Sequence, residues 1–179
     1  MSGLTPSQTV GPFFSIGLDW PQANRLTGDQ LIGQPLVLTG QVLDGDGQPV
    51  PDALLEIWQA DASGSYPRPG SAGFSGAGRC ATDADGRYVF ETLKPGGVTA
   101  DDGIAHAPVI NLVLFARGLL THLYTRVYFP EETAANAVDP ALGCVPEARR
   151  ASLLALREGD HYRFDIRLQG EAETVFFDV

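Results

Sequence analysis

Short segments of alternating apolar and polar residues recur along most of this 179-residue chain. A period of two places every second side chain on one face of an extended strand, so each segment predicts a β-strand with one buried face. Such segments lie at 36–43, 54–59, 87–92 and 162–168. Residues 44–49 are Asp-Gly-Asp-Gly-Gln-Pro, a run of turn-forming residues. The pattern predicts a hairpin in which 36–43 pairs with 54–59.

Two segments in the middle of the chain stand out. Val109–Ala116 is almost continuously apolar, which is typical of a central strand covered on both faces. Residues 122–129 alternate, with an apolar face of Leu123, Thr125, Val127 and Phe129. The opposite face consists of His122, Tyr124, Arg126 and Tyr128. A solvated face more often carries Lys, Glu or Thr, so rings around a single arginine indicate that something covers this face.

The two ends of the chain depart from the strand pattern. Residues 2–34 show little periodicity and many Gly and Pro residues, which predicts an extended arm. Residues 146–159 begin with Pro-Glu and end at Gly159, which predicts one short helix. Residues 174–179 predict a closing strand. We therefore expect a mainly β protein, with an N-terminal arm at 1–35 that packs on a partner chain and a β-sandwich domain at 36–179.

Charge and composition narrow the function. The formal net charge is −10, which disfavours nucleic-acid binding because that affinity depends on clustered Lys and Arg. The start lacks a basic and apolar leader pattern, and Asn111 and Arg117 interrupt the most apolar region, so we expect a soluble, cytoplasmic protein without a membrane segment. Cys80 and Cys144 form no Cys-x-x-Cys motif, and we expect two buried thiols.

A search for reactive groups finds little. The three histidines, His106, His122 and His161, show no metal-ligand spacing, and no nucleophile or phosphate-loop motif occurs. Asp83-Ala-Asp-Gly has the form of a turn, with a calcium loop as the minor alternative because Lys94 stands where a closing Glu would be needed. The residues alone therefore indicate a binding domain without its own reactive centre.

Several longer motifs nevertheless carry a resemblance. They lie at 5–14 (Thr-Pro-Ser-Gln-Thr-Val-Gly-Pro-Phe-Phe), 55–66, 78–88, 162–171 and 173–178. Together and in this order they resemble the intradiol ring-cleavage dioxygenases, and within them the metal-free α chains of the two-chain enzymes. The resemblance implies a β-sandwich and, in the iron-bearing chains, a non-haem ferric ion held by two tyrosines and two histidines.

Only one of those four ligand positions holds a matching residue. Tyr66 occupies the place of the first tyrosine, while the second would fall at 97–100 and the two histidines at Val109 and Asn111. One oxygen donor cannot hold iron tightly, because affinity needs several preorganised ligands. The resemblance therefore implies that Fe(III) is bound by a homologous β chain in an obligate hetero-oligomer, and that this chain has no metal ligands and no catalytic residue of its own.

The resemblance also implies which residues face the substrate. These are Thr9, Gly11 and Pro12 in the N-terminal motif and an arginine on a later strand, which we place at Arg126. The implied reaction inserts dioxygen into 3,4-dihydroxybenzoate between its hydroxyl-bearing carbons and forms 3-carboxy-cis,cis-muconate. Two alternatives remain: a stand-alone sandwich module that binds a ligand without catalysis, and an iron enzyme for catechol or hydroxyquinol with unrecognised ligands.

Overall fold

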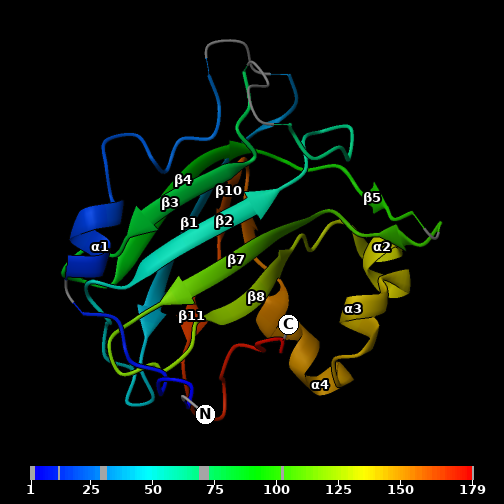
Figure 1. Cartoon of the computed structure of the whole chain (residues 1–179). Helices are drawn as coiled ribbons and strands as arrows, with labels where there is room; N and C mark the ends of the chain where they lie inside the picture. Colours follow the sequence, from blue (N-terminus) through cyan, green and yellow to red (C-terminus); the bar gives the residue numbers. More distant parts are fainter. Residues whose placement is uncertain (1–2, 12, 29–31, 69–72, 102, 179) are drawn as a thin grey trace.

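Two β-sheets stack face to face in the computed structural model, which describes residues 3–11, 13–28, 32–68, 73–101 and 103–178 (Figure 1). Strand β1 (Pro35–Leu43) lies at the centre of the first sheet. It pairs antiparallel with β4 (Arg87–Leu93) on one side and parallel with β10 (His161–Arg163) and β11 (Ile166–Arg167) on the other. Strand β9 (Leu156–Glu158) pairs with β10 and completes this sheet.

The second sheet is antiparallel, with the order β3-β2-β7-β8. Its strands are β2 (Leu54–Gln59), β3 (Ala77–Ala81), β7 (Val109–Phe115) and β8 (Leu123–Tyr128). The apolar run that predicted a central strand is β7, and it does lie inside the sheet. A small ribbon of β5 (Val98–Thr99) and β6 (Ala105–His106) stands beside the start of β7.

The core lies between the two sheets. Leu38 and Phe90 of the first sheet and Leu55, Ile57 and Leu112 of the second are at most 2% exposed and belong to one apolar cluster. Full burial of one such side chain contributes about 1.5–3 kcal/mol to stability. The predicted mainly β architecture, with alternating strands packed as a sandwich, is therefore confirmed.

The predicted pairing of 36–43 with 54–59 is wrong. The turn after β1 does form, since the Asp44 and Val50 N–H groups donate to the carbonyls of Gln48 and Val42. The chain then crosses to the other sheet, so β1 and β2 face each other through the core. A hairpin would have left the apolar faces of both strands on a single sheet, whereas the crossover buries one against the other.

The predicted helix at 146–159 is also wrong in extent. Helix α4 covers only Glu147–Arg150, a 3-10 turn follows at Ala151–Leu153, and the chain then extends into β9. The Ala155 N–H donates to the Tyr128 carbonyl at 3.0 Å, so pairing with β8 and β10 replaces the last helical turns. Two further helices, α2 (Thr133–Val138) and α3 (Pro140–Gly143), were not predicted.

Among the described residues, no helix is long and apolar enough to cross a membrane.

This chain covers part of the ring-rich face of β8, as predicted, whereas His122 on the same face is exposed. Tyr128 is fully buried in a second apolar cluster with Leu142, Val145 and Leu153, which belong to the helical region beside the sheet (Figure 1). The closing segment contributes the other part, because Phe177 forms an isolated bridge to Tyr124. The strand predicted at 174–179 is reduced to this bridge, and Val179 lies outside the described residues.

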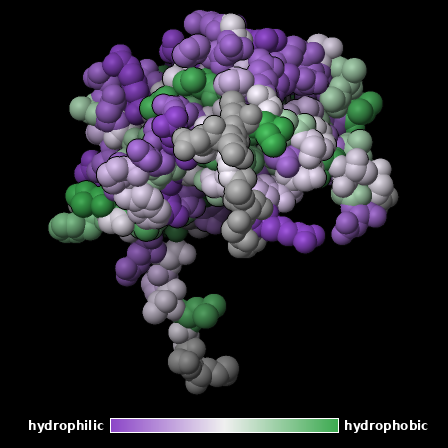
Figure 2. All heavy atoms as spheres, turned by 90° about the horizontal axis from the view of Figure 1, so that it is seen from above, coloured by the Kyte–Doolittle hydropathy of each residue, from purple (hydrophilic) through white to green (hydrophobic). Residues whose placement is uncertain are grey.

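The N-terminal arm is only partly extended. It contains helix α1 (Phe13–Leu18), and Leu26 enters the core between the sheets. The ring of Phe14 lies 5.0 Å from that of Phe115. Other apolar side chains remain outside: Leu4, Phe13 and Ile16 are 100%, 81% and 70% exposed. The first described residues project away from the body of the molecule (Figure 2).

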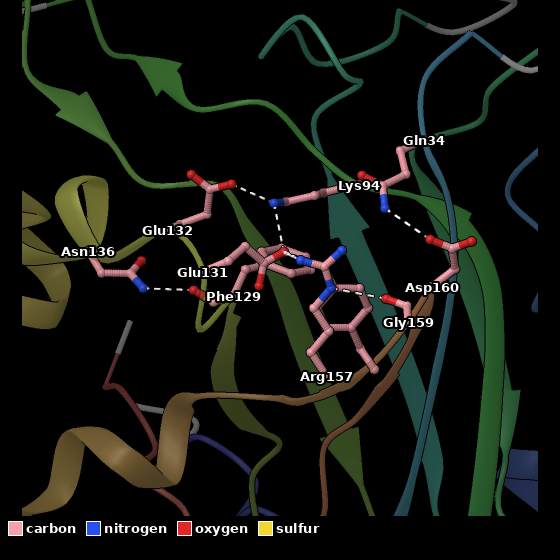
Figure 3. A network of polar contacts seen from close by, with 10 residues as sticks. Gln34, Lys94, Phe129, Glu131, Glu132, Asn136, Arg157, Gly159 and Asp160 are labelled. Carbon is pink, nitrogen blue, oxygen red and sulfur yellow. Dashed lines mark hydrogen bonds and ion pairs between the residues drawn. The ribbon is translucent and has the colours of Figure 1, made fainter.

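A surface polar network joins the two sheets at one edge (Figure 3). The Lys94 ammonium at the end of β4 donates to Glu131 at 2.8 Å and also to Glu132. The Tyr162 hydroxyl donates to the same Glu131 carboxylate, and Gln34 donates to Asp160 at 3.1 Å. Because Lys94 pairs with both glutamates and the other polar groups are hydrogen-bonded, we interpret the network as a structural clamp. The thiols differ from expectation: Cys80 is half-buried and Cys144 is exposed.

Candidate functional site

Arg126, the arginine singled out from the sequence, lies half-buried in the middle of β8. It stands opposite Asn111 of β7. Its Nε donates to the Tyr124 hydroxyl at 3.3 Å, and its guanidinium carbon lies 5.9 Å from the centre of the Phe177 ring. Burial lowers the pKa of Arg126, but hydrogen bonds with Tyr124 and Tyr128 outweigh this and raise it. Arg126 is therefore a fixed cation.

Arg126 borders a cavity of about 220 Å³, which we call the inner pocket. The pocket lies where β7 and β8 meet the β5–β6 ribbon and the loop after β2. Its lining residues are Tyr66, Val98, His106, Ala107, Val109, Asn111 and Arg126. A chain of hydrogen bonds orders its floor: Tyr124 donates to Asn111 Oδ1 at 2.6 Å, and Asn111 Nδ2 donates to the Trp58 carbonyl at 3.0 Å.

The inner pocket also collects all the positions at which the resemblance would place iron ligands. Tyr66, Val98 within 97–100, Val109 and Asn111 come from separate segments and meet here. The donors do not fit a ferric ion: two positions are valines, and Asn111 already uses its amide in two hydrogen bonds. The fixed cation of Arg126 would also repel a metal ion. In the described part of the chain, no three His, Cys, Asp or Glu side chains are grouped to hold a metal.

A buried carboxylate supports one side of this pocket. Asp139 accepts hydrogen bonds from the backbone N–H groups of Ala107 (3.0 Å) and Leu142 (2.9 Å) and from the Tyr128 hydroxyl (2.9 Å). Burial raises the pKa of Asp139, but these hydrogen bonds lower it by more, so the carboxylate stays ionised. Burial and the nearby Asp139 charge raise the pKa of Tyr128 well above its usual range. Asp139 thus holds α3, β6 and β8 together.

Thr9 and Gly11 lie elsewhere, at the turn between β7 and β8. Thr9 Oγ1 accepts a hydrogen bond from the Gly118 N–H at 2.8 Å. Gly118 has φ +90°, a left-handed conformation that residues with a side chain rarely adopt. The Gly11 carbonyl accepts from the Phe14 N–H at 3.0 Å and begins α1. Pro12 lies outside the described residues. We call Thr9, Gly11 and this turn the arm–hairpin edge.

The structure therefore does not bring Arg126 together with Thr9 and Gly11 within this chain. The inner pocket lies near the start of β7, whereas the arm–hairpin edge lies beyond its end. Another arginine, Arg117, directly precedes Gly118, the residue that Thr9 contacts. Its side chain is 60% exposed and pairs with Asp52 at 2.8 Å. Sequence reasoning treated Arg117 only as an interruption of an apolar run. The sequence did contain a signal for Arg117: it lies between the end of a predicted strand and a glycine, and residues in that position usually occupy exposed turns, where binding residues are common.

Two other regions of the molecule are weaker candidates for a functional site. A larger cavity, about 570 Å³, lies beside β1, β3 and β4, and none of the predicted site residues lines it. Its charges are satisfied internally, since Arg163 pairs with Asp165 at 2.7 Å. The carboxylate of Asp83 accepts from the backbone N–H groups of Asp85 and Arg87, as expected for a turn.

Comparisons with known proteins decide the family. The family model Dioxygenase_C, described as a dioxygenase, matches residues 10–170. The protocatechuate 3,4-dioxygenase alpha chain of Burkholderia cepacia is 46% identical, over 98% of this chain and 97% of its own. That of Pseudomonas putida is 47% identical, over 97% and 96%. The chain belongs to the intradiol ring-cleavage dioxygenase family.

Other intradiol dioxygenases are more distant. The protocatechuate 3,4-dioxygenase beta chain of Burkholderia cepacia is 38% identical over 84% of this chain and 71% of its own. The solved dioxygenase domain of a carbohydrate-binding fusion from Streptomyces sp. SirexAA-E matches with a TM-score of 0.62 and 28% identity, covering 92% of this chain and 97% of that domain. This family is iron-dependent. Similarity to enzyme chains over nearly the whole sequence disfavours a stand-alone binding module.

Proposed function

We propose that this chain is the metal-free α chain of a protocatechuate 3,4-dioxygenase. One observation carries the proposal: the chain is 46–47% identical to two such alpha chains over nearly its full length. The donor set of the inner pocket supports it, because valines and an engaged asparagine replace the metal ligands. The iron would then be held by a homologous β chain. A cytoplasmic location is part of the same proposal.

The reaction would add both atoms of O2 to 3,4-dihydroxybenzoate and cleave the ring between the hydroxyl-bearing carbons, giving 3-carboxy-cis,cis-muconate. Ferric iron on the β chain would supply activation of the catecholate. This chain would supply part of the pocket wall and a cation for the ring carboxylate. Such positioning accelerates a reaction by removing the entropic cost of orienting the substrate.

Thr9, Gly11 and Pro12 are proposed to form that wall. Thr9 and Gly11 are exposed, and they lie on an arm whose apolar side chains Leu4, Phe13 and Ile16 lack a cover in this chain. Burying exposed apolar side chains of this kind against a partner chain stabilises the complex. We therefore propose that the arm at 1–35 packs on the β chain and presents Thr9 and Gly11 to its substrate.

Two arginines are candidates for the carboxylate cation. The role predicted for Arg126 stays a prediction, and its guanidinium faces the inner pocket of this chain. Arg117 is the second candidate, favoured because its neighbour Gly118 donates a hydrogen bond to Thr9 and because its side chain is exposed. Either guanidinium could pair with a carboxylate through two parallel hydrogen bonds.

Co-expression with a homologous β chain tests the proposal. We expect a stable complex with one iron per α–β pair and dioxygenase activity only when both chains are present. The isolated α chain should bind no stoichiometric iron and show no visible charge-transfer band. Stoichiometric iron or ring cleavage in the isolated chain would contradict the proposal.

A further inference from the structure

The inner pocket contains a cation without a matching anion. None of the ion pairs found among the described residues involves Arg126. Its guanidinium carries five N–H donors, and its neighbours on β8 offer only the hydroxyls of Tyr124, at 3.3 Å from Nε, and Tyr128. The buried carboxylate of Asp139 accepts a hydrogen bond from the Tyr128 hydroxyl and forms no ion pair with Arg126 among the described residues. A half-buried cation is costly unless an opposite charge accompanies it.

A second polar group of the pocket is also under-used. Nδ1 of His106 is buried and has no hydrogen-bond partner, and it lies 3.5 Å from an Asp139 oxygen. The His106 side chain is 28% exposed and lines the same cavity as Arg126. The pocket therefore combines a fixed positive charge with an imidazole, and none of its lining residues is acidic.

The remaining walls are apolar and aromatic. Val98, Ala107 and Val109 line the cavity, and the Tyr66 ring stacks on Trp58 at 4.5 Å between centroids. Ligand cavities for drug-sized molecules are about 300–1,000 Å³, so a cavity of about 220 Å³ suits a single ring. A bare inorganic anion would leave the apolar walls without contacts.

From this arrangement, we propose that the inner pocket binds a small aromatic monocarboxylate. The ligand carboxylate pairs with the Arg126 guanidinium, and its ring lies against Val98, Val109 and Tyr66. The positions that correspond to the metal ligands thus line an anion site in this chain, and the Arg126 guanidinium supplies its positive charge. The proposal shares Arg126 with the sequence-based prediction for the substrate carboxylate, but it concerns a site whose lining residues all belong to this chain, so the chain without its partner can test it.

Binding of ¹³C-carboxyl-labelled benzoate to the full chain without its partner tests this site by NMR, because the proposed α–β substrate site is then absent. We expect saturable binding with a Kd of about 1 mM or tighter. Benzamide, the neutral isostere, should bind about 10-fold or more weakly, because a charged hydrogen bond is lost. Arg126→Gln should lower benzoate affinity to a similar extent, and Arg126→Lys should lower it less.

Two further variants keep the test decisive if Arg126→Gln perturbs folding. Val98→Phe should fill the pocket and weaken benzoate binding while Arg126 is intact, and Arg87→Gln, at an exposed arginine of β4 that pairs with Asp85, should leave it unchanged. The proposal is overturned if benzoate shows no saturation, if benzamide binds equally well, or if the Arg126 and Val98 variants bind as the wild type does. Equally tight binding of inorganic phosphate would also overturn it, since the apolar walls would then contribute nothing.

Discussion

The inner pocket and the arm–hairpin edge lie at opposite ends of β7 and differ in how they are built. The inner pocket is enclosed by strands, and hydrogen bonds through Asn111 and Tyr124 hold Arg126 in place. The arm–hairpin edge depends on one contact between Thr9 and the Gly118 N–H, and Arg117 there is exposed. The first is complete within this chain. The second has the character of a surface that a partner completes, since its apolar neighbours are uncovered.

Substituting the two arginines separately gives the largest expected effect. In the reconstituted enzyme, we expect Arg117→Ala to lower kcat/KM for 3,4-dihydroxybenzoate by about 30-fold or more, because losing one partner of a desolvated charge pair costs about 2–5 kcal/mol. Catechol, which has no carboxylate, should be little affected. The sequence-based prediction assigns the same loss to Arg126→Ala.

The ratio of the two substrate efficiencies separates these possibilities, because damage to the fold would slow both reactions. If the ratio of the two substrate efficiencies changes only in the Arg126 variant, Arg126 and not Arg117 binds the substrate carboxylate. An unchanged ratio in both variants would show that another group holds the carboxylate.

Introducing a negative charge on the exposed arm should weaken the association of this chain with the β chain. Phe13→Asp or Ile16→Asp should reduce association with the β chain, because a permanent interface of about 2,000 Å² or more would bury these side chains. The melting temperature of the isolated chain should stay within a few degrees, since Phe13 and Ile16 are exposed in it. Analytical ultracentrifugation of the mixed chains measures the effect.

Val138→Asp is the matched control for the arm, because Val138 is 72% exposed on α2 and has no proposed contact with the β chain. If the two arm variants assemble as well as Val138→Asp does, the arm does not form the interface.

Removing the Asp139 charge should loosen the frame of the inner pocket. Asp139→Asn leaves backbone donors without a full acceptor set, so we expect a loss of about 1–3 kcal/mol at pH 7. The pKa of Asp139 is lowered in the folded state, so its stabilising effect is present above its unfolded pKa and is lost as the pH falls below that value. The stabilities of the two proteins in urea unfolding should therefore converge as the pH falls through the lowered folded-state pKa of Asp139.

The exposed Asp178→Asn variant should remain close to the wild type at every pH. A stability difference for Asp139→Asn that does not change with pH would mean that shape, and not charge, holds α3 against β8.

The smallest effect is expected at the arm–hairpin edge. Thr9→Val removes the oxygen that accepts from Gly118, a hydrogen bond worth about 0.5–1.5 kcal/mol. Hydrogen exchange at the Gly118 amide should accelerate, while amides of β7 and β8 keep their protection. Thr9→Ser, which retains the oxygen, should behave as the wild type; faster exchange in both variants would contradict a role for this hydrogen bond.

Local pattern was enough to predict the longer strands, because alternation is a property of neighbouring residues, but it did not predict β3, β5, β6 or β9. The apolar run became β7, and the alternation at 162–168 buried Tyr162, Phe164 and Ile166. The covered face of β8 was predictable from its rings. The prediction of a helix at 146–159 failed because the Ala155 N–H donates to the Tyr128 carbonyl, a partner 27 residues away that no local pattern reveals.

The sequence by itself determined the fold class, the family resemblance and the replacement of metal ligands by valine and asparagine, since these depend on residue identity. The tertiary structure decided which sheet each strand joins, because apolar faces must find each other across the core. It also decided that Tyr66, Val98, Val109 and Asn111 surround Arg126, and that Thr9 lies beside Arg117. Charge and shape act through space, so only the folded chain shows which cation serves which pocket.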